Sequence, residues 1–222
     1  MSVVARKSSS LGIAQSLVLA MLLSVGSTDF LPSAEAAPPV ISYNNQVCDL
    51  SNGSGTLASP YLISTADQLW EATDCTRVGG SPSYLELANN IDVSVATNAP
   101  TNSPIGFSSS SVIYTFSGTL DGKGYEISGI AMSRTDGVGL FAYLSGATLK
   151  NFSLAGSLTT SATADSENNS AGALAIRSTN SVTIDAVTNS ASVRGGWRVG
   201  GLIGFHGRTG LNDALTTLQI LN

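Results

Sequence analysis

The fold is decided by a short glycine-containing stretch that occurs three times. Residues 138–141 read VGLF, residues 171–174 read AGAL, and residues 199–204 read VGGLIG. The glycines at the second position of each stretch are 33 and then 28 residues apart. An internal period of about 20–50 residues is typical of solenoids, in which neighbouring units bury surfaces that no single unit can bury. We therefore expect stacked repeat units.

Apolar and polar residues alternate in the segments around these stretches. Residues 125–130, 147–156 and 182–187 follow this pattern, with Val, Ile, Leu and Phe in alternate places and Ser, Thr and Asn among them. Strict alternation indicates a half-buried strand, and glycine allows tight corners and close approach of neighbouring units. The sequence thus predicts an all-β fold, a parallel β-solenoid.

A short helix is expected ahead of the repeats. A strand is expected at residues 60–63, and Ser64 has the character of a helix N-cap, with Asp67 three residues later as a variant capping box. Leu69 and Trp70 then lie on one face of the helix. This helix would cover the first repeat unit, whose exposed edge would otherwise invite pairing with other chains.

The N-terminus has the layout of a secretory signal peptide. Arg6 and Lys7 precede an apolar run at residues 11–25, and the small-residue triplet Ala34-Glu35-Ala36 follows. This order predicts cleavage after Ala36, before Ala37. The alternative is a membrane anchor, but the run is shorter and more interrupted than the roughly 20 residues that a bilayer requires. We therefore expect no membrane span after signal removal.

Export changes how the two cysteines are interpreted. Cys48 and Cys75 both follow the signal peptide, and an oxidising compartment favours a disulfide between them. Such a bond would contribute roughly 3 kcal/mol by the loop-entropy argument. A metal site is the alternative, but two cysteines and the distant His206 are fewer than the four ligands of a structural zinc.

Several motifs, in their order along the chain, resemble secreted bacterial GLUG-motif repeat proteins. Residues 55–69 and 84–92 look like the opening of these proteins, residues 116–127 (FSGTLDGKGYEI) resemble their first repeat, and the VGLF and VGGLIG stretches resemble the repeat itself. The resemblance covers about residues 53 to 207. It implies a right-handed parallel β-helix on secreted or surface proteins that are often large and adhesin-like. It supplies no shared catalytic residues.

The predicted organisation has three parts. These are the signal peptide at 1–36, an N-terminal cap region with strands and one short helix at 37–111, and GLUG-like solenoid repeats at 112–222. The AGAL stretch departs from the family pattern at its second glycine. Residues 211–222 neither complete a repeat nor supply a clear cap, so a fragment of a longer protein is a further hypothesis.

Composition restricts the classes of function. The 222 residues contain 10 Lys and Arg, 15 Asp and Glu and one His, with a net charge of −5. An acidic chain without a basic patch argues against nucleic-acid binding. The single histidine and few carboxylates leave little material for acid–base or metal chemistry, so we expect no cofactor and no metal.

The densest acidic set is Asp121, Glu126 and Asp136. It could form a calcium or polysaccharide-lyase-like cluster, but hard cations need six to eight oxygen ligands. We favour turn chemistry for Asp121, an outward strand position for Glu126 and a loop for Asp136. His206 has no acidic partner near it in the sequence and is expected to be a surface residue in a turn.

The most basic and aromatic stretch provides possible ligand contacts. Arg194, Trp197, Arg198 and Arg208 could bind a sugar or an anion, and Trp197 could stack on a carbohydrate ring. The alternative is an exposed loop between repeats without a ligand.

The sequence favours a secreted or cell-surface, non-enzymatic β-solenoid that takes part in adhesion. Its partners would be host or matrix glycans or proteins. One alternative is a polysaccharide-active enzyme on a β-helix, and another is an N-terminal fragment whose activity lies downstream.

Overall fold

The computed structural model describes residues 42–43, 46–47, 52–71, 84–97, 102–106, 115–195, 197–207 and 217–221, all within one compact unit, Pro38–Asn222. The predicted signal peptide, the Ala36–Ala37 cleavage site and both cysteines of the predicted disulfide, Cys48 and Cys75, lie outside these residues. So does Arg208.

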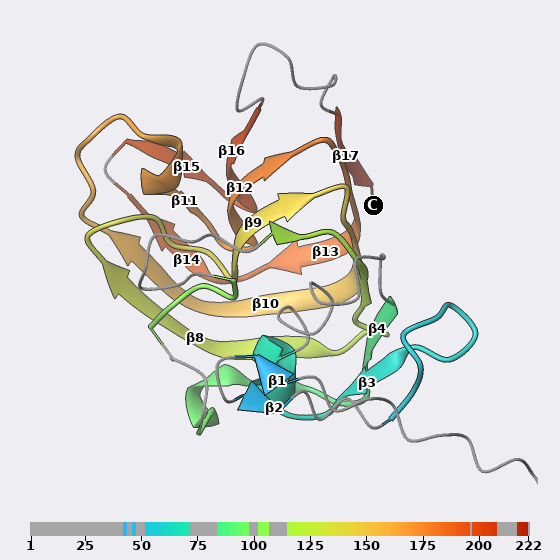
Figure 1. The fold of residues 1–222 in the computed structure, drawn as a ribbon. Helices are drawn as coiled ribbons and strands as arrows, with labels where there is room; N and C mark the ends of the chain where they lie inside the picture. The colour runs from blue at the N-terminus through green and yellow to red at the C-terminus, as the bar shows by residue number, and fades with distance from the viewer. Residues whose placement is uncertain are drawn as a thin grey trace, which may run out of the picture. The chain divides into compact units, whose positions relative to one another are not determined.

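The described residues are almost entirely β structure (Figure 1). The exceptions are a helical turn at residues 66–71 and two 3-10 turns, η1 (Val93–Val95) and η2 (Glu167–Asn169). The strands are β1 (Ser42–Tyr43), β2 (Gln46–Val47), β3 (Tyr61–Ile63), β4 (Tyr84–Leu87), β5 (Ile91–Asp92), β6 (Thr115–Phe116), β7 (Thr119–Asp121), β8 (Glu126–Arg134), β9 (Phe141–Ser145), β10 (Thr148–Thr160), β11 (Ser170–Gly172), β12 (Ala175–Thr179), β13 (Ser181–Asn189), β14 (Ser192–Arg194), β15 (Arg198–Gly200), β16 (Ile203–His206) and β17 (Thr217–Leu221). The expectation of an all-β fold is confirmed.

Strands from successive repeat units pair in parallel. The largest sheet has the order β17-β13-β10-β7-β4-β3, with β8, β5 and β14 joined to it. A second sheet has the order β16-β12-β9-β6, and β11 pairs with β15. In Figure 1 the second sheet passes through β9, β12 and β16 as the colour changes from yellow to red. Each ladder therefore joins segments that are distant in sequence but equivalent in the repeat.

The strand register places equivalent residues in rows. One row contains Leu85, Leu120, Leu149 and Ile184, all buried in a continuous apolar core. The row beside it contains Thr119, Thr148 and Thr183, which are all half-exposed. Successive residues of a strand point to opposite faces, so apolar residues fill the interior and threonines cover the outside. Burying one leucine contributes about 1.5–3 kcal/mol.

The repeated glycines of the VGLF and AGAL stretches lie where backbones approach closely. A Cβ added at Gly139 would lie 2.6 Å from the backbone nitrogen of Ile176, and one added at Gly172 would lie 2.5 Å from the carbonyl oxygen of Ala175. Real Cβ contacts are longer than this. Only glycine fits at these positions, which explains the period seen in the sequence.

Left-handed backbone forms the corner between the second sheet and the largest one. Gly146 has φ 67° between β9 and β10, and Asn180 has φ 55° between β12 and β13. Asparagine tolerates this conformation better than most residues because its short polar side chain can hydrogen-bond locally. Here the Asn180 amide donates to Ser145 Oγ over 2.6 Å. Glycine and asparagine are thus equivalent solutions for one corner.

The predicted helix is present, but its cap residue differs from the prediction. The Gln68 backbone N–H donates to Thr65 Oγ1 over 3.2 Å, and the Ser64 N–H donates to Gln68 Oε1 over 2.8 Å. Thr65, followed by Gln68 three residues later, makes the capping contact, so the assignment to Ser64 is wrong by one residue. Leu69 is buried, as the predicted apolar face requires.

Two stretches of β structure are interrupted. Strand β4 ends at Leu87, pairing resumes in β5 at Ile91, and η1 begins at Val93. In β8 the buried residues Ile127 and Ile130 are three positions apart because the β8–β10 ladder shifts register between Leu154 and Gly156. A β-bulge adds one residue to a strand and changes the face of every later side chain.

In the part of the chain that the structure covers, no helix has both the length and the apolar character needed to cross a membrane.

Candidate functional site

The carboxylates of Asp121 and Asp136 in the acidic set bind different partners. Asp121 lies at the end of β7, where its Oδ1 accepts hydrogen bonds from Asn151 Nδ2 and the Lys123 backbone N–H, both over 3.0 Å. Lys150 Nζ lies 3.3 Å from its Oδ2. The carboxylate thus fixes the Asp121–Gly124 turn, in agreement with the turn chemistry expected from the sequence.

These contacts alter the acidity of Asp121. Burial on its own would raise the pKa of the carboxyl group. The hydrogen bonds from Asn151 and Lys123, together with the Lys150 ammonium, lower the pKa by more than burial raises it, so the net pKa lies below the usual value. The group is therefore a charged structural anchor at neutral pH.

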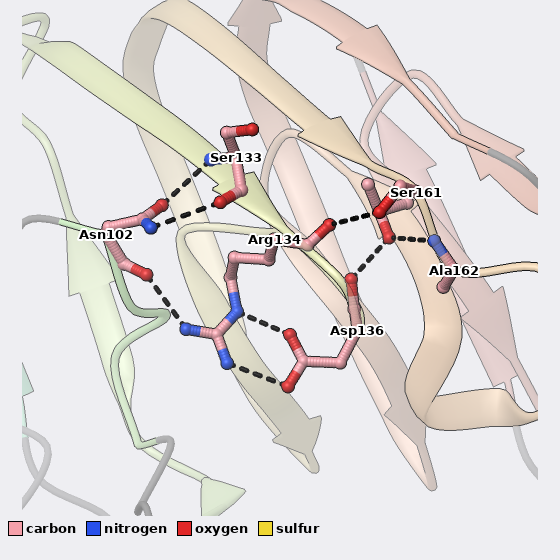
Figure 2. A network of polar contacts seen from close by, with 7 residues as sticks. Asn102, Ser133, Arg134, Asp136, Ser161 and Ala162 are labelled. Carbon is pink, nitrogen blue, oxygen red and sulfur yellow. Dashed lines mark hydrogen bonds and ion pairs between the residues drawn. The ribbon is translucent and has the colours of Figure 1, made fainter.

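Asp136 belongs to a different cluster, centred on Arg134 at the end of β8 (Figure 2). Arg134 Nε and Nη2 donate to the two carboxylate oxygens of Asp136 over 2.6 and 2.8 Å. Arg134 Nη1 donates to the Asn102 carbonyl over 2.8 Å, and the Asn102 side chain exchanges two hydrogen bonds with the Ser133 backbone. This Arg134 clamp, formed by Asn102, Ser133, Arg134 and Asp136, holds residues 102–106 against β8.

Contacts on the other side join the clamp to β10. Thr160 Oγ1 donates to the Asp136 carbonyl over 2.5 Å and accepts from the Ala162 N–H over 3.0 Å, and the Ser161 N–H donates to the Arg134 carbonyl over 2.9 Å. The hollow above this network has a volume of about 380 Å³. Because its polar groups already bind one another, the hollow has the character of a structural junction.

Glu126 is the third residue of the acidic set. It begins β8, and its backbone N–H donates to Asn90 Oδ1 over 3.0 Å. The contacts of the Asp121 and Asp136 carboxylates involve different residues, and within the described ranges no group of three or more His, Cys, Asp and Glu residues could hold a metal ion.

His206 differs from its prediction. It lies in β16, not in a turn, and it is half-buried. Its Nδ1 is 2.8 Å from Ser178 Oγ on the neighbouring strand β12. Burial lowers the pKa of the imidazole below its ordinary value. The repeat contained a signal for this contact, because Ser178 and His206 each lie six residues after a repeated glycine, Gly172 and Gly200.

The possible ligand contacts occupy the corner between β14 and β15. Arg194 is exposed on β14, and the Trp197 side chain, 56% exposed, lies just before β15. Arg198 is used within the protein, because its Nη2 is 2.7 Å from Asp165 Oδ1 and its guanidinium lies 4.6 Å from the Phe205 ring centre. The structure thus leaves Arg194 and Trp197 accessible, and their role as ligand contacts stays a prediction.

The buried Arg177 was not singled out in the sequence. The Arg177 guanidinium on β12 lies 4.6 Å from the Tyr143 ring centre, and its Nη2 is 2.6 Å from Glu167 Oε2. Tyr143 precedes Arg177 in the parallel ladder and Phe205 follows it. The apolar–polar alternation of β12 does not indicate the Arg177–Glu167 ion pair, because Glu167 belongs to η2 and not to a strand of the ladder.

The outer face carries two regular polar rows. Besides the threonine row, the next outward row contains Glu86, Asp121, Lys150 and Asp185. Neighbouring strands of a sheet lie about 4.8 Å apart, so each row repeats its side chains at that spacing. A hollow of about 630 Å³ opens beside the second row, lined by residues that include Asp121, Lys123 and Asn151. This repetitive surface is the best candidate for contact with an extended partner.

Comparison with known proteins gives two relatives of limited coverage. The chain is 32% identical over 157 residues to halomucin of Haloquadratum walsbyi, which is 68% of this chain and 2% of that protein. It is 32% identical over 111 residues to a protein of Evansella cellulosilytica named as a Gly-rich membrane protein, which is 48% of this chain and 12% of that protein. The chain thus spans a small fraction of the length of both relatives.

No family model matches the chain. Among solved structures, a chain from Bacteroides ovatus that carries the name of an immunoglobulin A1 protease matches with a TM-score of 0.39 and 15% identity. The match covers 76% of this chain and 66% of that one. A score this low carries neither the fold nor the activity of that protein to this chain.

Proposed function

We propose that the protein is a secreted or cell-surface, non-enzymatic right-handed parallel β-helix of the GLUG-motif type that binds extended glycans or matrix proteins. The observation that carries the proposal is the outward threonine row Thr119–Thr148–Thr183 beside the charged row. Hydroxyl groups repeated at a fixed spacing suit a polymer with a repeated polar unit, because many weak contacts along one partner add to a useful affinity.

Other observations support the same function. The ladders join equivalent positions of successive repeat units in parallel, which is the arrangement expected of a β-helix. The two relatives bear the names of a halomucin and a Gly-rich membrane protein, which agree with a location outside the cytoplasm. The predicted signal peptide would deliver the chain there.

The test is a binding panel with a variant that removes only the hydroxyl groups. The triple substitution Thr119→Val, Thr148→Val and Thr183→Val keeps the size and the β propensity of the row. We expect the native chain to bind at least one glycan or matrix protein of the panel. The triple variant should bind the same partner at least about tenfold more weakly, a change of 1.4 kcal/mol.

The control removes stacked hydroxyls elsewhere. Ser157 and Ser192 are paired and exposed where β14 joins β10, so Ser157→Ala with Ser192→Ala should leave binding unchanged. Equal loss in both variants would contradict a role for the threonine row, and a native chain that binds nothing would contradict the proposal. Released unsaturated sugar on incubation with pectin or alginate and Ca²⁺ would contradict the non-enzymatic part.

A further inference from the structure

The hollow of about 630 Å³ beside the charged row is formed by three successive repeat units, whose strands β8, β10 and β13 lie side by side (Figure 1). Its lining comes from their equivalent corners: Lys123 and Gly124 after β7, Asn151 and Ser153 in β10, and Ala186 and Thr188 in β13. We name it the corner hollow. Small-molecule sites usually have volumes of about 300–1,000 Å³, so the corner hollow is large enough to hold one unit of a polymer.

Small residues and left-handed backbone keep the corner hollow open. Gly124 has φ 87°, Asn151 has φ 58° and Ala186 has φ 50°. A Cβ added at Gly124 would meet no atom within 4 Å. The backbone of these corners is therefore accessible from outside, and a ring-shaped ligand can approach Gly124 and Ala186 without a clash.

Two hydroxyl groups line the corner hollow. Ser153 and Thr188 pair in the β10–β13 register, so their side chains lie about 4.8 Å apart, the spacing of neighbouring strands. In the part of the chain that the structure describes, neither side-chain hydroxyl makes a hydrogen bond. Each can therefore donate to or accept from a ligand, and both can contact one ligand unit.

The backbone amides around the corner hollow are used within the protein. The Gly124 N–H donates to the Asn151 carbonyl over 2.7 Å, and the Ser153 N–H donates to the Tyr125 carbonyl over 3.2 Å. An extended peptide that adds to a sheet obtains its affinity from main-chain hydrogen bonds, and these amides are already paired. The remaining hydrogen-bonding groups are side-chain hydroxyls, which suit a ligand that is itself rich in hydroxyl groups.

The cations beside the corner hollow are paired. Lys150 Nζ lies 3.3 Å from Asp121 Oδ2, and Lys123 Nζ lies 3.5 Å from Glu86 Oε1. Asp185, the last member of the charged row, has no ion pair among the described residues. The charge left over is negative, so an acidic sugar would be repelled and a neutral one would not.

We propose that the corner hollow is a subsite for one neutral hexose unit of a glycan chain, held by hydrogen bonds with Ser153 Oγ and Thr188 Oγ1. This inference rests on the proposed function and narrows its partner to uncharged glycans. Thr148 and Asn151 are three residues apart on β10, about 10 Å along an extended strand. One glycan can therefore contact the corner hollow and the threonine row together.

The test titrates the full chain by calorimetry with neutral hexose oligomers and with galacturonate oligomers of equal length. We expect the native chain to bind at least one neutral oligomer and no galacturonate oligomer. Ser153→Ala with Thr188→Val removes both hydroxyls and should weaken binding of that neutral oligomer at least about tenfold.

The matched control again removes two stacked hydroxyls, from β10 and β14. Ser157→Ala with Ser192→Ala should leave the binding of the neutral oligomer unchanged. Circular dichroism should show that both double variants fold like the native chain. A second measurement uses no variant: in an NMR titration of the labelled native chain, the neutral oligomer should shift the amide signals of Gly124, Ser153 and Ala186.

The outcomes separate this inference from the proposed function. Unchanged amide signals, a Ser153–Thr188 variant that binds like the native chain, or galacturonate bound as tightly as neutral sugar would each overturn the subsite. If the threonine-row variant still loses binding in that case, the proposed function stands. A native chain that binds only matrix proteins would also overturn the subsite alone, and one that binds no partner at all would overturn both.

Discussion

Ala186 occupies a backbone conformation that alanine adopts at a cost. Its φ is 50°, and it stands in β13 between Asp185 and Val187, which pair with Lys150 and Phe152 of β10. The residue between those two β10 positions is Asn151, whose φ is 58°. The same corner thus contains asparagine in one repeat unit and alanine in the next, although only the asparagine side chain can offset the strain by a local hydrogen bond.

Ala186→Gly is therefore expected to stabilise the protein. Glycine adopts positive φ without steric penalty, and the exposed Ala186 side chain has few contacts to lose. We expect the free energy of unfolding to rise by about 0.5–1 kcal/mol, measured by denaturant titration. Ala131→Gly, at an exposed position of β8 with ordinary φ, should lower it instead; a gain of similar size at both positions would contradict the explanation.

His206 makes stability depend on pH. The folded protein holds the pKa of the imidazole below 6.5 because burial disfavours the charged form, so the unfolded chain binds the proton first as the pH falls. The free energy of unfolding should be highest above about pH 6.5, decrease as the pH falls toward the folded-state pKa, and level off below it.

Two measurements check this dependence. As the only histidine in the sequence, His206 gives a single imidazole signal in an NMR titration, and its midpoint should lie below 6.5. His206→Gln should remove the decrease in stability between pH 7 and pH 5. A midpoint at or above 6.5 would show that the Ser178 contact and burial do not favour the neutral ring.

At the scale of elements, the Arg134 clamp joins three segments. Asp136→Asn keeps the shape of the side chain but removes the charge that Arg134 Nε and Nη2 bind. We expect a loss of about 1–3 kcal/mol in unfolding free energy, since hydrogen bonds to partly buried charges are strong.

The matched control is Glu86→Gln. The Glu86–Lys123 pair is longer, at 3.5 Å, and more exposed, so its removal should cost less than about 1 kcal/mol. Equal losses for the two variants in denaturant titrations would show that the clamp contributes no more than a surface ion pair.

The clamp also shows where sequence-based prediction ended. The strands, the glycine period and the Asp121 turn were predictable because each depends on residues near one another in the chain. Asn102 and Arg134 are 32 residues apart and meet only through the ladder register. That register depends on the lengths of the corners and on the bulge beside Gly156, and alternation alone does not specify either. The Arg134–Asp136 ion pair is local in the sequence, because Asp136 lies in the bend directly after the end of β8.

At the scale of the whole molecule, the core consists of rows of inward-facing side chains, in which each repeat unit contributes one residue to a row. Leu149 is fully buried between Leu120 and Ile184, so Leu149→Ala should cost about 2–5 kcal/mol. Ile220→Ala removes a similar side chain from the same row at its exposed end and should cost less than about 1 kcal/mol. Thermal unfolding of dilute samples would compare the two, and equal losses would contradict the continuous-core description.

The parallel ladders also determine how the protein responds to tension. Inter-strand hydrogen bonds of a sheet run across the strands, and here they join β17 to β13, β13 to β10 and so on toward β3. A force applied between Tyr61 and Leu221 thus acts along the direction of those bonds. It loads them a few at a time, so the strands peel away in sequence at low force and lengthen the tether in steps. A protein with this topology should therefore extend gradually under tension and should not break at a single threshold.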